Sequence, residues 1–339
     1  MSTVPRPGGG LLVGVDVGGS KIAVLVTDSA LAVRGRYALP TNVGAPDRAV
    51  EVIGAAIGAA LDDAGADLGS VVAVGIGVPG RVDPLAGSVS QAVNLGWHDL
   101  PLGPALSAAL GVPVSLENDV RAAALGLLDR RILGDVEDFA YLSIGTGISA
   151  GIVLDGRLRR GPRGMAGEIG HIVVDASGPA CPCGLRGCLE TLAAGPAIAR
   201  RAAEALAADG RSSLARVSHL DAADVYEAAA GGDALAIRVA DEVGTLLARA
   251  VHLLAMAYDI EVVAVGGGVA RARDAFLDPL LRALDRIRDD SPLARQVLVP
   301  GVVHLLPAGD TGAWGGIALA RSAAAMASPT AVGTEVADG

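Results

Sequence analysis

Apolar residues along this chain follow two alternating patterns, short continuous runs and longer segments with helical spacing. Runs such as VVAVGIGV at 71–78 are rich in β-branched residues and bounded by glycine or polar residues, which is typical of buried strands. The alternation of such runs with amphipathic segments predicts an α/β protein. The predicted strands are 11–17, 22–27, 71–77, 112–116, 139–144, 149–154, 261–265 and 297–303, and the predicted helices are 46–64, 102–110, 119–130, 194–208, 233–257, 273–287 and 312–327.

One pattern, a strand followed by a turn of small residues and a second strand, occurs twice. It is found in LLVGVDVGGSKIAVLVTD at 11–28 and again in FAYLSIGTGISAGIVLDG at 139–156. Small residues leave the backbone N–H groups of each turn clear of side chains, so both turns could hold phosphate groups. Two ordinary tight hairpins would have the same pattern, so the interpretation depends on the motifs around them.

Composition and charge narrow the class of protein. The 339 residues are enough for two domains with buried cores, and with 51% hydrophobic but 2% aromatic residues those cores must be aliphatic. The net charge of −10 argues against a nucleic-acid partner, which requires basic patches. No run predicts a membrane span and no signal peptide is visible, so we expect a cytoplasmic protein. We expect residues 1–10 and 328–339 to be disordered.

Residues suited to nucleotide binding follow several predicted strands. Asp16 ends the first strand in DVGGSK, and a carboxylate beside a phosphate-binding turn suits Mg²⁺, usually through water. Lys21, the only lysine of the chain, follows that turn. The glycines of VGGGV at 265–269 would let a flat ligand such as adenine approach the backbone. These turns match neither the Walker A loop nor the GxGxxG fingerprint, which argues against P-loop and dinucleotide-binding proteins.

The segment SLENDVRAAALG at 115–126 places Asn118 and Asp119 between a strand and an alanine-rich helix. A carboxylate at the carboxyl end of a strand lies where open α/β sheets bind ligands. There Asp119 could accept the proton of a substrate hydroxyl. A helix N-cap is the alternative role, because aspartate is common at that position.

All three cysteines lie in CPCGLRGC at 181–188, and His171 lies shortly before them. Three thiolates and one imidazole form a tetrahedral zinc set that is closed and therefore structural. A redox role requires Cys-x-x-Cys, which the Cys-Pro-Cys spacing does not provide. Glu168 and Glu190 flank the set, and carboxylates at defined positions can accept hydrogen bonds from sugar hydroxyls. Either glutamate could equally be an ordinary solvated loop residue.

Together these segments resemble the ROK family of sugar kinases and repressors, which has the actin/hexokinase-like ATPase fold. The resemblance runs from about residue 11 to about residue 325. It is carried in order by DVGGSK, GIGVPGRVDPLAGSV, NLGWHDLPL, ENDVRAAALG, IGTGISAG, GEIGH, CPCGLRGCLE and VGGGVA. It implies two RNase H-like domains flanking a deep cleft. They are an N-terminal domain at 11–117 completed by the helix at 312–327, and a larger C-terminal domain at 118–311 containing a zinc-binding loop at 168–190.

The family pattern also implies a role for each matching residue. Asp119 matches the catalytic base, and with Asn118 it forms a sugar-binding pair. The further implied sugar contacts are Gly80, Asn94, Glu168, His171 and Glu190. The residues implied for ATP and Mg²⁺ are Asp16, Gly18, Gly19, Ser20, Lys21, Gly145, Thr146, Gly147, Gly266, Gly267 and Gly268. The implied zinc ligands are His171, Cys181, Cys183 and Cys188, so that His171 serves both metal and sugar.

Four residues depart from the common family pattern and leave the identity of the sugar open. Ser20 replaces the commoner threonine, Arg121 stands where many relatives have asparagine, and Ser149-Ala150 stands where glycines are frequent.

The resemblance implies an ATP:hexose phosphotransferase, with glucose as the first expectation, in a homodimer or homotetramer. Kinases of N-acetylmannosamine, N-acetylglucosamine, fructose, amino sugars or cyclitols are alternatives, because the motifs do not encode the pocket around the sugar 2-position. A family repressor would carry an N-terminal helix-turn-helix domain, for which the roughly ten residues before the first strand leave no room. The presence of Asp119 and both phosphate turns argues against a catalytically silent sugar sensor.

Overall fold

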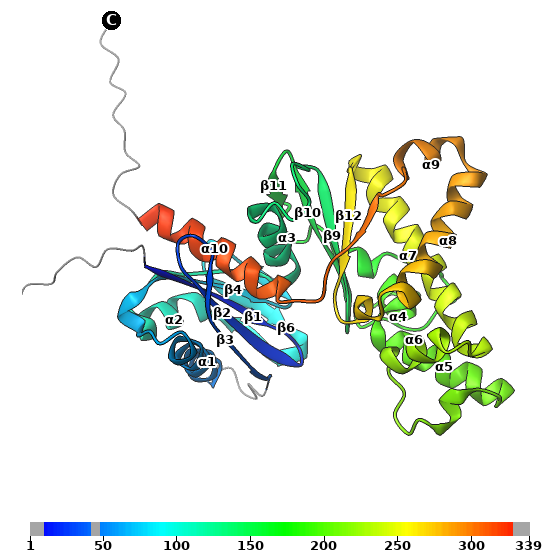
Figure 1. Cartoon of the computed structure of the whole chain (residues 1–339), viewed down its shortest axis with the longest axis horizontal. Coiled ribbons are helices and arrows are strands. Elements are labelled where there is room, and N and C mark those ends of the chain that lie inside the picture. Colours follow the sequence, from blue (N-terminus) through cyan, green and yellow to red (C-terminus); the bar gives the residue numbers. More distant parts are fainter. Residues whose placement is uncertain (1–9, 42–47, 328–339) are drawn as a thin grey trace, which may run out of the picture. The chain divides into compact units, whose positions relative to one another are not determined.

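The structure is a computed structural model that describes residues 10–41 and 48–327 (Figure 1). The described residues form two compact units. The first contains the residues up to Leu133 and those from Asp310 onward, and the second is Gly134–Gly309. The predicted disordered ends lie outside the described residues, except for Gly10. Among the residues described, none of the helices has both the length and the apolar composition that a membrane crossing needs.

The first unit is built on a mixed five-stranded sheet with the order β3-β2-β1-β4-β8. Strand β1 pairs antiparallel with β2 and parallel with β4, and β4 pairs parallel with β8. Because parallel strands share a direction, β1 and β8 end at the same edge of the sheet, and this edge carries Asp16 and Asn118. The strands are β1 (Leu11–Val17), β2 (Lys21–Thr27), β3 (Val33–Pro40), β4 (Val71–Val78) and β8 (Val114–Asn118).

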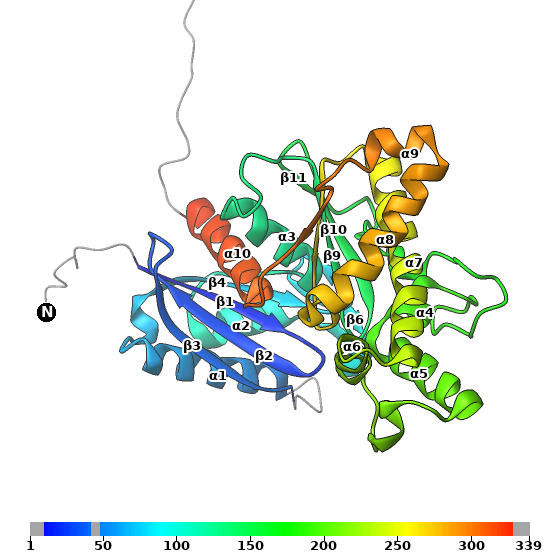
Figure 2. The ribbon, with the colours of Figure 1, turned by 45° about the vertical axis from the view of Figure 1, so that its right-hand side comes forward.

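Alternating residues of these strands pack on opposite faces of the sheet. Leu12 packs with Ile317 of α10 (Thr311–Ala327), whereas Val13 belongs to the cluster that contains Ile57. Figures 1 and 2 show α10 on one face and the helices α1 and α2 on the other. A three-stranded antiparallel sheet completes the unit. These further elements are α1 (Ala49–Asp63), α2 (Leu102–Leu110), α3 (Asp119–Asp129), β5 (Arg81–Asp83), β6 (Ser88–Ala92) and β7 (Trp97–Leu100).

Glycines allow α10 to lie directly on the sheet. A Cβ added at Gly14 would lie 2.1 Å from the carbonyl oxygen of Ala313, and one added at Gly75 would lie 2.0 Å from that of Gly316. Backbone therefore packs on backbone at these positions, where any side chain would force the layers apart. This contact holds the N-terminal end of α10 beside Asp16.

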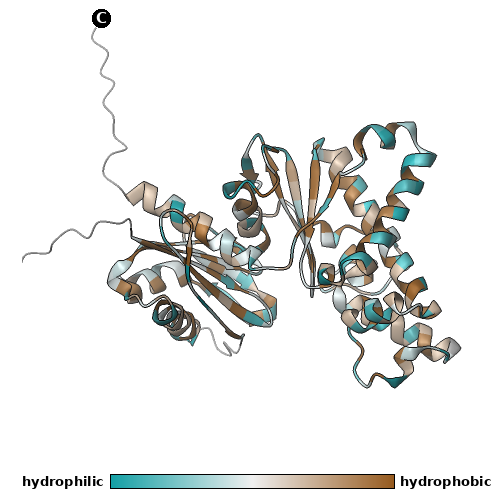
Figure 3. Cartoon of the chain, in the orientation of Figure 1, coloured by the Kyte–Doolittle hydropathy of each residue, from teal (hydrophilic) through white to brown (hydrophobic). Residues whose placement is uncertain are grey.

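The second unit is built on a mixed sheet with the order β11-β10-β9-β12-β13. Strand β9 pairs antiparallel with β10 and parallel with β12. Val263 of the sheet and Leu247 of α7 belong to one apolar core. Figure 3 colours β9, β10 and β12 mainly as hydrophobic, and polar residues gather on α8 and α9. The elements are β9 (Phe139–Ile144), β10 (Ile148–Leu154), β11 (Arg157–Arg159), β12 (Val262–Gly266), β13 (Val303–Leu305), α4 (Leu189–Ala193), α5 (Gly195–Asp209), α6 (Ala222–Ala230), α7 (Ala234–Tyr258), α8 (Asp274–Asp290) and α9 (Pro292–Val297).

Most predicted elements are present, with small shifts at their ends, but the strand predicted at 297–303 is wrong. Its first residue ends α9, and the short strand β13 begins only at its last residue, Val303. The apolar run LVPGVV contains Pro300 and Gly301, and Gly301 has φ +90°, so the chain turns there. The sequence prediction also omitted β3, whose exposed polar residues hide a strand pattern.

The boundary between the units differs from the predicted one at 117/118. Helix α3 belongs to the first unit and packs against α10. A Cβ added at Gly126 of α3 would lie 2.7 Å from the backbone nitrogen of Gly315 in α10. Asp119 therefore sits in the same unit as Asp16. The deep cleft between domains stays a prediction.

Candidate active site

The turn between β1 and β2 is held from outside by Thr41. Its hydroxyl donates a hydrogen bond to the carbonyl oxygen of Gly18 at 2.7 Å, and its N–H donates to that of Ser20 at 2.9 Å. Within the turn, the Gly18 N–H donates to the carbonyl oxygen of Lys21 at 2.8 Å. Residues Gly19 to Lys21 are exposed, and no atom outside the turn lies within 4 Å of where a Gly19 Cβ would be. The turn is thus fixed in shape but open to a ligand.

Asp16 lies beside this turn, near two other carboxylates, those of Asp119 and Asp310. The pKa of Asp16 is raised to about 7, chiefly by burial and then by the nearby carboxylate of Asp119. The positive charge of Lys21 opposes this rise, and Asp310 adds further repulsion. A Cβ at Gly312, in the first turn of α10, would lie 2.3 Å from an oxygen of the Asp16 side chain. Carboxylates that repel one another in this way suit a divalent cation.

Asn118, and not Asp119, caps helix α3. Its side-chain oxygen accepts hydrogen bonds from the N–H groups of Val120 at 3.1 Å and Arg121 at 3.2 Å. Its amide nitrogen donates to the carbonyl oxygen of Gly80 at 3.2 Å. The half-buried Asp119 accepts a hydrogen bond from the Val120 N–H at 2.9 Å. The N-cap role that the sequence offered for Asp119 belongs to Asn118. Asp119 is the first residue of the helix and lies near Asp16.

A buried ion pair that the sequence analysis missed supports this junction. Arg121 Nε donates to Glu117 Oε1 at 2.9 Å, with 2% and 0% of the side chains exposed. The same carboxylate oxygen accepts the N–H of Asn118 at 2.9 Å. The ion pair connects the end of β8 to the first turn of α3, so it fixes the backbone of Asn118 and Asp119 between them. The only signal in the sequence was the charged pair at a spacing of four residues.

The two other predicted sugar contacts of this unit differ in their surroundings. Gly80 has φ +90° and packs so closely that a Cβ would lie 2.2 Å from the carbonyl oxygen of Gln91. Gly80 also accepts the hydrogen bond from the side-chain amide of Asn118 described above. Asn94 is exposed on a short 3-10 helix, Val93–Leu95.

The second predicted phosphate turn adjoins the glycine segment predicted for adenosine. Strands β9 and β12 are parallel neighbours, so Gly145 and Gly266 lie at the same edge of the sheet. Gly267 has φ +92°, and its Cβ would lie 2.3 Å from the carbonyl oxygen of Ile144. A Cβ at Gly145 would lie 3.9 Å from the backbone nitrogen of Gly268. The fold therefore brings together two glycine segments that are far apart in the sequence.

Glycines also seat the GEIGH segment on strand β10. A Cβ at Gly167 would lie 1.7 Å from the carbonyl oxygen of Ala150, and the Ala150 N–H donates to the carbonyl oxygen of Gly167 at 2.8 Å. The chain then forms a 3-10 turn, Ile169–His171, in which the N–H of His171 donates to the carbonyl oxygen of Glu168 at 3.2 Å. Glu168 and His171 therefore lie close together on one turn.

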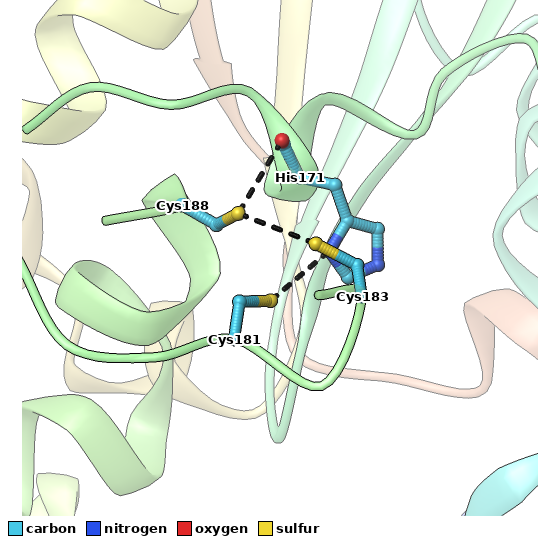
Figure 4. Close-up of side chains that lie close together, drawn as sticks. All are labelled: His171, Cys181, Cys183 and Cys188. Atoms are coloured by element: carbon cyan, nitrogen blue, oxygen red, sulfur yellow. Dashed lines mark hydrogen bonds between the residues drawn. The ribbon is translucent and has the colours of Figure 1, made fainter. Parts of the chain in front are cut away.

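His171 and the three cysteines form one cluster (Figure 4), as the sequence predicts. Their ligand atoms all lie within 4.8 Å of one another. His171 Nδ1 lies 3.5 Å from Cys181 Sγ, and Cys183 Sγ lies 3.6 Å from Cys188 Sγ. Tetrahedral zinc, with bonds of about 2.0–2.3 Å, sets ligand atoms about 3.3–3.8 Å apart, so the donor set and these two distances fit zinc.

The surroundings of Cys188 favour its neutral thiol. Its pKa is raised to about 12, chiefly by burial, and contacts with Cys183 and Cys181 contribute to that rise. A metal ion would bind the thiolate and release its proton, so binding must weaken as the pH falls.

Glu190 lies on the first turn of α4 and contacts the second predicted phosphate turn. Its Oε2 accepts a hydrogen bond from the N–H of Ile148 at 2.9 Å. The sequence analysis placed Glu190 at the sugar and did not foresee this contact, because nothing in the local sequence relates residues forty-two positions apart.

A model of the ROK family matches residues 12–322. The chain belongs to the ROK family. The predicted α/β ROK fold is thereby confirmed. A glucokinase of Halalkalibacterium halodurans is 35% identical over 288 residues, which are 82% of this chain and 87% of that relative. An N-acetylmannosamine kinase of Citrobacter koseri is 32% identical over 260 residues, 76% of this chain and 83% of that relative.

Solved ROK structures include both kinases and regulators. A ROK glucokinase from Streptomyces griseus in complex with glucose and AMPPNP superposes with a TM-score of 0.78 at 32% identity, covering 92% of this chain and all of that one (100%). A ROK transcriptional regulator, a homologue of the E. coli MLC protein, superposes with a TM-score of 0.80 at 28% identity, covering 93% of this chain and 78% of that one. The similarity supports a sugar kinase and leaves its sugar open.

Proposed function

We propose that this ROK protein is an ATP-dependent hexose kinase that converts glucose to glucose 6-phosphate. The observation that carries the proposal is the strand–helix junction of β8 and α3. There Asn118 provides the helix cap and the buried ion pair fixes the backbone, so that Asp119 is presented beside Asp16 in a unit that also carries a phosphate-type turn.

In the proposed reaction Asp119 is the general base. Its carboxylate accepts the proton of the sugar 6-hydroxyl as the hydroxyl oxygen forms a bond to the γ-phosphorus. The bond from that phosphorus to the β,γ-bridging oxygen breaks, and ADP leaves with the bond's electrons. Because the transition state of phosphoryl transfer is loose, most of the catalysis comes from positioning and from neutralising charge. The rigid junction around Asp119 serves that purpose.

The sugar-binding residues follow the family pattern. Asn118 and Asp119, with Gly80 behind them, bind on the first unit, and Glu168, His171 and Glu190 bind on the second. Carboxylates can accept hydrogen bonds from neighbouring hydroxyls of a sugar. His171 presents Nδ1 to the cysteines, so its Nε2 stays available to a hydroxyl.

The nucleotide would be held by the two turns and the glycine segment at 266–268. Backbone N–H groups of the turns at 18–20 and 145–147 would bind phosphate oxygens. Asp16 and Asp310 would hold Mg²⁺ through water, and bound Mg²⁺ neutralises charge on the transferred phosphoryl group. Lys21 adds a positive charge at the first turn.

Zinc would be held by His171, Cys181, Cys183 and Cys188 as a structural ion, since four protein ligands close the site to substrate. A bound ion of this kind supplies rigidity only. The protein's own contribution is the loop that carries Glu168 and Glu190 on either side of the cluster.

We expect loss of this cluster to impair sugar binding while leaving the rest of the fold intact. Cys183→Ser removes an exposed ligand, so it should lower zinc content and raise the KM for the sugar by at least about tenfold, the lower range for disturbed metal sites. Zinc is measured by atomic emission and KM by steady-state kinetics. Ser177→Ala, on the same loop, is the control. Unchanged kinetics in a zinc-free variant would contradict the structural role.

The function is tested by a coupled ADP-release assay with ATP and Mg²⁺ over hexoses, N-acetylhexosamines and cyclitols. We expect glucose to have the highest kcat/KM. N-acetylmannosamine is the second candidate substrate, because the Citrobacter koseri relative is an N-acetylmannosamine kinase. A preference for it would keep the proposed mechanism and change the substrate. Absence of turnover on the whole panel by zinc-containing protein would refute the kinase and favour a sugar-responsive regulator.

A further inference from the structure

The carboxylate of Glu190 is built into the second phosphate turn. Its Oε2 lies 2.9 Å from the backbone nitrogen of Ile148, the first residue after the turn at 145–147. A Cβ added at Gly147 would lie 2.4 Å from the same oxygen. The carboxylate therefore occupies the space that a side chain at Gly147 would fill. A hydrogen bond from an N–H group to an ionised carboxylate is among the stronger ones in proteins.

The segment that carries Glu190 is anchored at both ends. Cys188 directly precedes α4, and its neighbour Leu189 donates an N–H to the carbonyl oxygen of Ile172 at 3.0 Å. After α4, the N–H of Gly195 donates to the carbonyl oxygen of Gly145 at 2.8 Å. The segment 188–195 thus begins in the cysteine cluster with Cys188. It contacts the start of the phosphate turn through Gly195 and the end of that turn through Glu190.

We propose that Glu190 is a positioning residue that holds the 145–147 turn in its phosphate-binding shape and so couples the cysteine loop to nucleotide affinity. This inference rests on the proposed function and deepens it. One carboxylate oxygen holds the turn, and the other oxygen is the one that a sugar hydroxyl would reach. Sugar and nucleotide would then bind cooperatively, because both require the same orientation of one side chain.

The Kd of a nucleotide, measured without sugar, distinguishes a Glu190 that holds the turn from a Glu190 that only contacts the sugar. A residue that touches only the sugar cannot change the Kd of a nucleotide when no sugar is present. We expect Glu190→Ala to raise the Kd of AMPPNP with Mg²⁺, measured by calorimetry without sugar, by about 10–100-fold, the range for losing a hydrogen bond to a charged group. Glu190→Gln retains an acceptor oxygen, so it should keep most of the affinity. Glu204→Ala, an exposed glutamate on α5, is the matched control and should change nothing.

A double-mutant cycle tests the contact itself. Gly147→Ala should push the Glu190 carboxylate away from the turn and weaken AMPPNP binding in the wild-type background. In the Glu190→Ala background the obstructing oxygen is gone, so the same substitution should add little. Additive effects of the two substitutions would overturn the proposal, as would a wild-type Kd in Glu190→Ala accompanied by a raised sugar KM.

The outcomes separate this proposal from the proposed function. Wild-type turnover tests the kinase, whereas the variant Kd relative to wild type tests the coupling. Wild-type protein that binds AMPPNP but phosphorylates no sugar would refute only the kinase. Wild-type protein that binds no nucleotide would refute both. If Glu190→Ala lowers the melting temperature or zinc content, Glu190→Gln and Gly147→Ala decide the question.

Discussion

Asp119→Asn is expected to lower kcat by about 10²–10⁴-fold, the usual contribution of a positioned general base. The amide cannot accept the proton of the sugar hydroxyl, but it has the shape of the carboxylate. Its oxygen can still accept the hydrogen bond from the N–H of Val120, and Asn118 still caps the helix. The fold and the sugar KM should therefore remain close to wild type.

The measurement is steady-state kinetics with the best sugar of the panel, together with circular dichroism and thermal melting. Asp62→Asn, at an exposed position of α1, is the control and should retain wild-type kcat. A kcat for Asp119→Asn within threefold of the control would exclude Asp119 as the base.

Arg121→Met is expected to lower the free energy of unfolding by about 3–5 kcal/mol, the cost of removing one member of a buried ion pair. With Arg121 gone, the Glu117 carboxylate stays fully buried and retains the N–H of Asn118 as a weaker partner. Because Glu117 also holds the backbone N–H of Asn118, a shift of Glu117 would displace the neighbouring Asp119. We therefore expect kcat to fall as well. Denaturant unfolding at neutral pH measures the loss.

The double variant Glu117→Gln/Arg121→Met should be more stable than Arg121→Met, because neither residue is then charged. Arg34→Met provides the matched control, since Arg34 pairs with Asp28 at the surface and such pairs contribute about 0–1 kcal/mol. A loss for Arg121→Met no larger than that of the control would show that the buried pair does not stabilise the junction.

Local sequence predicted those parts of the site whose residues are close together in the chain. The cysteine cluster could be predicted because four residues with metal-binding atoms lie within one loop. The two hairpin turns and the strand–helix junction at Asn118 could be predicted because hydrophobic periodicity changes there. The strand predicted at 297–303 is wrong because its apolar residues resemble a strand, although Pro300 and Gly301 form an exposed turn within it.

The tertiary contacts of the site could not be predicted in this way. Asn118 rather than Asp119 is the cap, and its side-chain amide is held by the carbonyl oxygen of Gly80, which lies far earlier in the chain. Helix α3 belongs to the first unit because Gly126 lets it approach α10, whose residues come almost two hundred positions later.

The sequence by itself determined the α/β class, the ROK family and the residue types of the site, because these are written in periodicity and in motifs read within short windows. Only the tertiary structure decided that Glu117 and Arg121 are buried together, that Asp119 and Asp310 lie near enough to raise the pKa of Asp16, and that Glu190 accepts a hydrogen bond from the N–H of Ile148. The physical reason is that burial, pKa and hydrogen-bond partners depend on which distant segments pack together, and packing is a property of the whole chain.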